Sequence, residues 1–213
     1  VGWVDLQSPA LQEELTELKR NQKLKGFRHV LQSEQRRDLM LKSEFVNGIQ
    51  QLGRSGFIYD ILIHADQLQY VPELLSRCPD QLFVLDHIAK PDIKRRHINE
   101  WATEIKQLSS FENLYCKLSG MVTEADLQNW KVSDFEPYID VVFNAFGADR
   151  IMFGSDWPVC LLGAGYPEVI SIVEPYISKL TVDEQAAFWG NNASKFYKIN
   201  WSLWILNLEV KLL

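Results

Sequence analysis

The feature that most constrains this chain is a regular alternation between short apolar runs and longer amphipathic segments. Six runs have the length and composition of strands, and they occupy residues 1–6, 24–31, 57–65, 81–91, 113–120 and 150–158. The segments between them place apolar side chains at helical spacing, as in "HINEWATEIKQLSS". Repeated strand–helix units are joined by right-handed crossovers, so this order predicts a parallel sheet in an α/β fold.

Polar side chains gather where the apolar runs end, and their positions favour one kind of α/β fold. In a (β/α)₈ barrel the carboxyl ends of all strands surround a single site. A doubly wound sheet binds ligands mainly at one switch point, and the chain has no GxGxxG or Walker sequence to place there. We therefore predict a (β/α)₈, TIM-like barrel. Such barrels have eight strands and about 250 residues, so we expect the first one or two β/α units to be lacking in this chain.

Composition argues against some classes of partner and is consistent with a single domain. A formal net charge of -6 among 213 residues argues against a nucleic-acid partner and gives no reason to expect an anionic membrane surface. The three cysteines have no CxxC spacing, which fits a reducing, cytoplasmic location, and Cys116 and Cys160 fit buried thiols. We expect one domain over 1–199 and an atypical apolar tail over 200–213, with a small molecule as partner and an unknown oligomeric state.

The run "RIMFGSDWPVC" at 150–160 ends on a carboxylate, Asp156, between a glycine-containing turn and Trp157-Pro158. Because side chains alternate along a strand, Met152, Gly154 and Asp156 are predicted to share one face. If the opposite face packs on helices, Asp156 points into the mouth of the barrel. The alternative is that Asp156 caps the helix that follows.

Two further side chains have the chemistry of a site. His87 follows an apolar run and is predicted to share a face with Phe83 and Leu85, while Asp86 points the other way. An imidazole there suits a ligand or a general acid or base, although a core or rim histidine is the alternative. Lys117 lies within an apolar strand, where it can hold an anion or polarise a carbonyl; its alternative is a salt bridge across the barrel.

Arg28 and His29 are adjacent in "KGFRHVL", so strand alternation allows at most one of them to point fully inward. Gly26 and Arg28 share the face that we predict to be the inner one. A guanidinium group of Arg28 at that place can bind a carboxylate or sugar hydroxyls.

The segments "KGFRHVLQ", "FVLDHIAKP", "CKLSG", "FGSDWPVC" and "NNASKFY" together resemble the lactonase branch of the amidohydrolase superfamily. These are the L-fuconolactone hydrolase-like proteins, which are related to 2-pyrone-4,6-dicarboxylate lactonase. The resemblance runs in order from about residue 1 to 197. It implies a distorted (β/α)₈ barrel that opens a sugar lactone, or a similar small cyclic ester, with activated water.

The resemblance also implies roles for named residues. Asp156 would activate water, and it and His87 would be catalytic or would ligate a divalent metal such as Zn²⁺, although metal-independent catalysis is also implied for some relatives. Substrate contacts would fall on Arg28, Lys117 and His29. Trp157 would form a wall of the site.

The sequence departs from the family pattern at its start. The family opens with a strand that carries His-x-His, and no such pair occurs here, so the run at 1–6 would correspond to the third strand. Two alternatives to an active lactonase follow. One is a truncated, inactive product that acts only in binding, and the other is a decarboxylase of the same superfamily.

Overall fold

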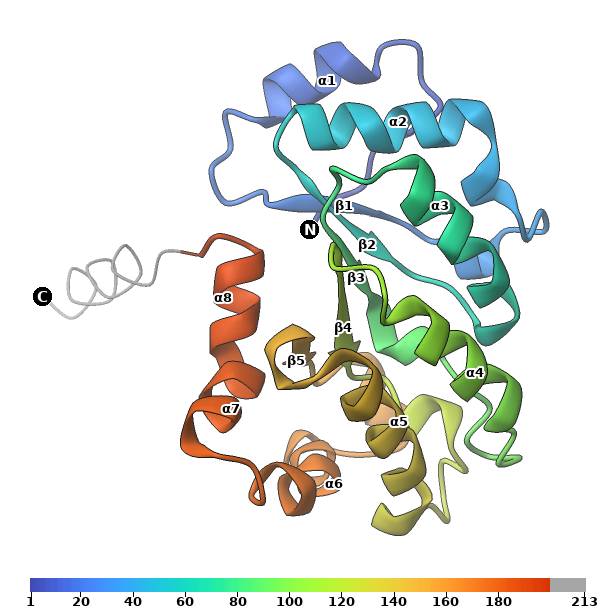
Figure 1. Ribbon diagram of the computed structural model, residues 1–213, viewed down its shortest axis with the longest axis vertical. Coiled ribbons are helices and arrows are strands. Elements are labelled where there is room, and N and C mark those ends of the chain that lie inside the picture. Colours follow the sequence, from blue (N-terminus) through green and yellow to red (C-terminus); the bar gives the residue numbers. More distant parts are fainter. Residues whose placement is uncertain (200–213) are drawn as a thin grey trace, which may run out of the picture.

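Five parallel strands form one sheet in the computed structural model, which describes residues 1–199 (Figure 1). They are β1 (Gly26–His29), β2 (Ile58–Ile61), β3 (Phe83–Leu85), β4 (Leu114–Leu118) and β5 (Ile151–Phe153). The strand order is β1-β2-β3-β4-β5, and each neighbouring pair is parallel. A doubly wound sheet reverses its order at a switch point, whereas sequential order is the winding of a β/α barrel. The predicted apolar tail, 200–213, lies outside the described residues.

Helices connect the strands and cover both faces of the sheet. The order is α1 (Leu11–Leu18), α2 (Ser43–Arg54), α3 (Val71–Arg77), α4 (Asn99–Leu108), α5 (Glu136–Phe146), α6 (Tyr166–Ile177), α7 (Val182–Ala186) and α8 (Asn192–Phe196). Figure 1 shows α2, α3 and α4 side by side along one face of the sheet and α8 on the other. None of the helices in the described part of the chain is both long and apolar enough to cross a membrane.

The first predicted strand is wrong in its length. Only Gly2 pairs with the sheet, through a parallel bridge to Phe27 in which the Gly2 amide donates to the Gly26 carbonyl at 2.8 Å. The chain then leaves the sheet because it passes directly over α2. The close approach is visible at Gly48, where an added Cβ would lie 2.2 Å from the carbonyl oxygen of Leu6.

The two faces of the sheet carry different side chains, as strand alternation requires. One face packs against the helices and forms the large core, to which Tyr59, Phe83, Leu85, Cys116 and Ile151 contribute. The other face has a small apolar cluster of Ile58, Val84, Met152 and Phe196, the last of which comes from α8. Toward the carboxyl ends of the strands this second face changes from apolar to charged, and the candidate site begins there. The three cysteines are free and buried, as predicted for Cys116 and Cys160.

Candidate active site

A network of buried charges lies above the apolar cluster. The Lys117 ammonium is 2.6 Å from Asp60 Oδ2 and 2.7 Å from Asp86 Oδ1. Arg28 Nη1 donates to Asp86 Oδ2 at 2.9 Å, and the Tyr197 hydroxyl donates to Asp60 Oδ2 at 2.9 Å. Asp60 and Asp86 are 1% and 0% exposed, so this network joins β1, β2, β3, β4 and the end of α8 inside the protein.

Electrostatics favour a charged lysine at the centre of this network. Burial opposes the charge on Lys117, but Asp86 and Asp60 outweigh it and raise the pKa of the ammonium group. Burial also raises the pKa of Asp60, while Lys117 opposes that effect. Lys117 therefore forms a salt bridge across the sheet. Its role in substrate binding stays a prediction.

The chain turns abruptly after β3. Four consecutive residues, His87, Ile88, Ala89 and Lys90, have φ of 54°, 47°, 58° and 51°. The left-handed region costs an L-residue roughly 1–2 kcal/mol, so tertiary contacts must hold this segment, which we call the left-handed segment. One such contact is buried: Trp101 Nε1 donates to the Ile88 carbonyl at 2.8 Å.

The left-handed segment corrects the predicted direction of the His87 side chain. Phe83 and Leu85 face the helix side of the sheet, so His87 does not share their face as the alternation rule predicted. Asp86 lies on the face opposite Phe83 and Leu85, as predicted, and binds Arg28 and Lys117 there. His87 departs from the pattern because β3 ends at Leu85, and the left-handed backbone then redirects His87.

His87 and Asp156 meet at the carboxyl ends of β3 and β5. His87 Nε2 lies 3.6 Å from Asp156 Oδ1, and the side chains are only 11% and 14% exposed. On its other side, His87 Nδ1 is 2.9 Å from Ser119 Oγ. Burial lowers the pKa of His87, although the negative charges of Asp86 and Asp156 oppose this effect. Two atoms at this separation can both contact one oxygen at roughly 2.8 Å.

The alternative reading of Asp156 as a helix cap does not match the geometry. The next helical turn, Val159–Leu162, has Pro158 at its N-cap and no side-chain capping hydrogen bond. Asp156 itself has a φ of 57°, a conformation that Asp and Asn tolerate better than most residues. Its carboxylate faces His87 instead.

The remaining predicted site residues are divided between two places. Arg28 lies on the inner face with its side chain 40% exposed, and the charges of Asp86, Asp60 and Asp156 all act on it. Trp157 follows Asp156 and is 65% exposed. His29 lies apart from this group, on the helix side of β1: its Nε2 is 2.8 Å from Glu34 Oε1, and its ring contacts Phe45 of α2.

Comparison with known proteins agrees with this architecture. The sequence profile of the amidohydrolase family matches residues 1–199. This chain belongs to the amidohydrolase family. It is 40% identical over 210 residues to an L-fucono-1,5-lactonase of Burkholderia multivorans, covering 93% of this chain and 71% of that protein. Identity to an L-rhamnono-gamma-lactonase of Scheffersomyces stipitis is 26% over 200 residues, covering 83% and 59%.

A solved structure shows the same fold. The crystal structure of a Burkholderia multivorans amidohydrolase with bound zinc superposes with a TM-score of 0.89 at 38% identity, covering 94% of this chain and 73% of that one. The predicted family and the predicted barrel-type fold are thus confirmed. Within the described residues of this amidohydrolase, the five strands follow one another in the sheet in chain order.

The predicted metal ligands of the amidohydrolase were His87 and Asp156. A catalytic zinc site usually has three protein ligands and an open position. Within residues 1–199, no group of three His, Cys, Asp or Glu side chains is arranged to hold a metal ion. His87 and Asp156 are two suitable donors side by side, so the described residues do not provide a complete catalytic zinc site.

Gly120 makes room for the His87 ring. It has a φ of 63°, and an added Cβ would lie 2.8 Å from both Cγ and Nδ1 of His87. We expect Gly120→Ala to destabilise the amidohydrolase by roughly 1–3 kcal/mol through overpacking, beyond the cost of the left-handed backbone. Urea unfolding of Gly120→Ala and Gly56→Ala measures this difference. Gly56 is the control because it has a positive φ of 81° at the end of α2 and nothing lies within 4 Å of its added Cβ; equal losses in the two variants contradict the proposed collision.

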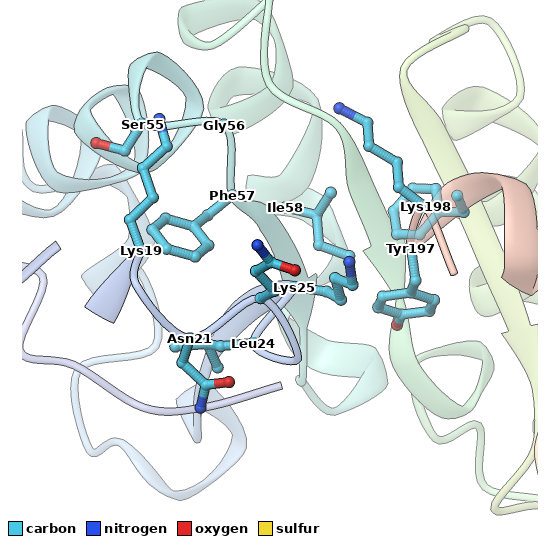
Figure 2. Close-up of a pocket in the computed structure, with 12 residues that line it drawn as sticks. Lys19, Asn21, Leu24, Lys25, Ser55, Gly56, Phe57, Ile58, Tyr197 and Lys198 are labelled. Carbon is cyan, nitrogen blue, oxygen red and sulfur yellow. The ribbon is translucent and has the colours of Figure 1, made fainter. Parts of the chain in front are cut away.

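A shallow pocket of about 140 Å³ lies at the opposite end of the strands, and Figure 2 shows it. Its lining includes Lys19 and Lys198, which lie on opposite sides in Figure 2, and Ile58, the first residue of β2. The ring of Tyr197 also lines it, while the hydroxyl of Tyr197 donates to Asp60. The pocket is therefore distinct from the site at the carboxyl ends, and Tyr197 lies between the pocket and the charge network.

Proposed function

We propose that this amidohydrolase opens a sugar lactone by hydrolysis and releases the corresponding hydroxy acid. The observation that carries the proposal is the 40% identity to an L-fucono-1,5-lactonase, extending over 71% of that protein. The convergence of His87 and Asp156 at the carboxyl ends of two strands supports it, because that is where β/α barrels hold their reacting groups. Decarboxylases are also similar in fold, but at 13% identity they support the fold alone.

In the proposed reaction Asp156 is the general base. It removes a proton from a water molecule as the water oxygen attacks the lactone carbonyl carbon. The carbonyl oxygen becomes negatively charged in the tetrahedral intermediate, and a hydrogen bond from His87 stabilises it. When the ring C–O bond breaks, the proton held by Asp156 passes to the departing ring oxygen. Water and lactone thus become one hydroxy acid, and both side chains return to their starting states.

Arg28 and Trp157 are the proposed substrate contacts. Arg28 uses one nitrogen to bind Asp86 and keeps part of its guanidinium group exposed at the inner face. That exposed part can donate to sugar hydroxyls or to the carboxylate of the product. Trp157 presents its exposed indole beside Asp156, where a flat apolar surface can pack against a sugar ring.

The test is a direct assay, and proton release is the readout because the product is an acid. The protein is mixed with L-fucono-1,5-lactone or L-rhamnono-gamma-lactone in weak buffer, with and without a chelator, and compared with buffer alone. We expect faster acid release than in buffer for at least one lactone. A folded protein that accelerates neither reaction, with or without added Zn²⁺, contradicts the proposed function.

A further inference from the structure

The His87 ring is held by a different partner at each nitrogen. Nδ1 lies 2.9 Å from Ser119 Oγ, within hydrogen-bonding distance. Nε2 faces Asp156 Oδ1 at 3.6 Å, which is too long for a direct hydrogen bond but close enough for strong electrostatic influence. The ring is packed by Gly120, where even one added methyl group would collide with it. His87 therefore has little freedom to rotate away from either partner.

These two partners select one tautomer of the neutral ring. A neutral imidazole carries a single N–H, and an ionised carboxylate can only accept a hydrogen bond. If the proton were on Nδ1, the lone pair of Nε2 would face the Asp156 oxygen, which is repulsive. A proton on Nε2 faces that oxygen favourably. Nδ1 is then the acceptor, and the Ser119 hydroxyl must be the donor.

The serine, histidine and aspartate together have the composition of a nucleophilic triad, but Ser119 has no access to substrate. Its exposed fraction is 3%. It packs directly against Gly154, where an added Cβ would lie 3.0 Å from Ser119 Cβ and 3.3 Å from its Oγ. A lactone carbonyl cannot reach an oxygen that is enclosed in this way. Ser119 is thus suited to orient His87 and is not placed to attack the substrate.

We propose that Ser119 is a positioning residue that holds His87 as an Nε2–H donor aimed at the reaction centre. This inference rests on the proposed function and assigns the roles within it. His87 donates to the carbonyl oxygen, and Asp156 is left as the base. The Ser119 hydroxyl donates to Nδ1, so loss of that hydroxyl removes the preference for the Nε2–H form without removing any group that touches the substrate.

The first test reads the tautomer directly, with no need for activity. The imidazole nitrogens are labelled with ¹⁵N, and two-bond ¹H–¹⁵N correlation spectra are recorded near neutral pH in the presence of a chelator. Comparison with His87→Gln identifies the signals. We expect the Nε2–H pattern for His87 in the unsubstituted protein. An Nδ1–H pattern overturns the proposal, whether or not the protein hydrolyses lactones.

Two variants then separate hydrogen bonding from packing. Ser119→Ala removes the hydroxyl, whereas Ser119→Cys keeps a similar shape but offers only a weak donor. We expect both variants to shift His87 toward a mixture of tautomers. If Ser119 served only to fill space, the Cys variant would keep the pattern of the unsubstituted protein, and that result overturns the proposal. Ser171→Ala is the control, since Ser171 is exposed and bonds only to a backbone carbonyl in its own helix.

Kinetics provide the second readout. Loss of one neutral hydrogen bond is expected to lower kcat roughly three- to tenfold in both variants, with KM little changed. An unchanged kcat in both variants contradicts the positioning role. If no protein form hydrolyses lactone while the spectra follow the expected pattern, the proposed function fails and the assignment of Ser119 stands.

Discussion

Asn in place of Asp156 is expected to lower kcat/KM for lactone hydrolysis roughly 10²–10⁴-fold while the protein stays folded. The reason is that an amide oxygen cannot take the proton that leaves the attacking water. Asn is the sharpest replacement because it has nearly the same shape and, like Asp, tolerates the φ of 57° found at this position. Initial rates of proton release measure the loss, and thermal unfolding measures whether the fold is retained.

Asp149→Asn is the matched control, since Asp149 is exposed and lies outside the site. It carries the same change in charge, so its rate corrects for any general effect of net charge on binding. We expect this control to keep the original activity. Asp156→Asn and Asp149→Asn with equal rates would falsify the role of Asp156 as the base.

Met in place of Lys117 is expected to reduce the free energy of unfolding by roughly 3–5 kcal/mol, the usual cost of removing one partner from a buried ion pair. Methionine fills a similar volume, so the loss reports the charge and not a cavity. Without the ammonium group, Asp60 and Asp86 would face each other across the sheet with both carboxylates buried. Urea unfolding of each variant measures the difference.

Two further proteins make this result specific. Lys179→Met removes an exposed lysine in the same way and is expected to change stability by less than about 0.5 kcal/mol. In Lys117→Met, Asp86 keeps Arg28 as a partner but Asp60 loses its cation. The double variant Lys117→Met with Asp60→Asn removes that unpaired carboxylate, so it is expected to recover part of the loss. A Lys117→Met protein as stable as the Lys179→Met control means that the network contributes little to folding.

The fold could be predicted because alternation along the chain is a local property. Strand-length apolar runs and helical spacing recur in a fixed order, and that order alone requires parallel strands. Within a strand the same reasoning placed Arg28 and Lys117 on the inner face, where the structure has them. The first run was less informative, because the close approach of Leu6 to Gly48 in α2 pulls the chain off the sheet.

The alternation rule failed at His87 because it holds only while the backbone is extended. The sequence "VLDHIAKP" gives no signal of four residues with left-handed backbone conformation, since none of residues 87–90 is a glycine. The error concerned His87 alone, because Asp86 lies opposite Phe83 and Leu85 as alternation predicts. Asp60 is a single carboxylate within the apolar run at 57–65, just as Lys117 is a single ammonium group within the run at 113–120. This similarity was the signal in the sequence that Asp60 also belongs to the charge network.

The strand pattern placed Ser119 at a strand end beside Lys117, but the contacts of Ser119 and Tyr197 could not be predicted, for another reason. Tyr197 meets Asp60 across 137 positions of sequence, and Ser119 meets His87 across 32. A serine at position 119 and a tyrosine at position 197 are ordinary residues for their surroundings in the sequence. Only the folded structure therefore reveals these contacts. Asp156 was easier to find, because the glycine before it and the Trp-Pro pair after it end the strand.

The left-handed segment has a consequence for how the protein fails under stress. Its four residues together cost roughly 4–8 kcal/mol, which is comparable to the whole net stability of an ordinary domain. The packing around His87 and the bond from Trp101 to the Ile88 carbonyl must offset this cost at all times. The segment can therefore relax before the sheet melts, so heat or denaturant should abolish catalysis in molecules whose secondary structure is still intact.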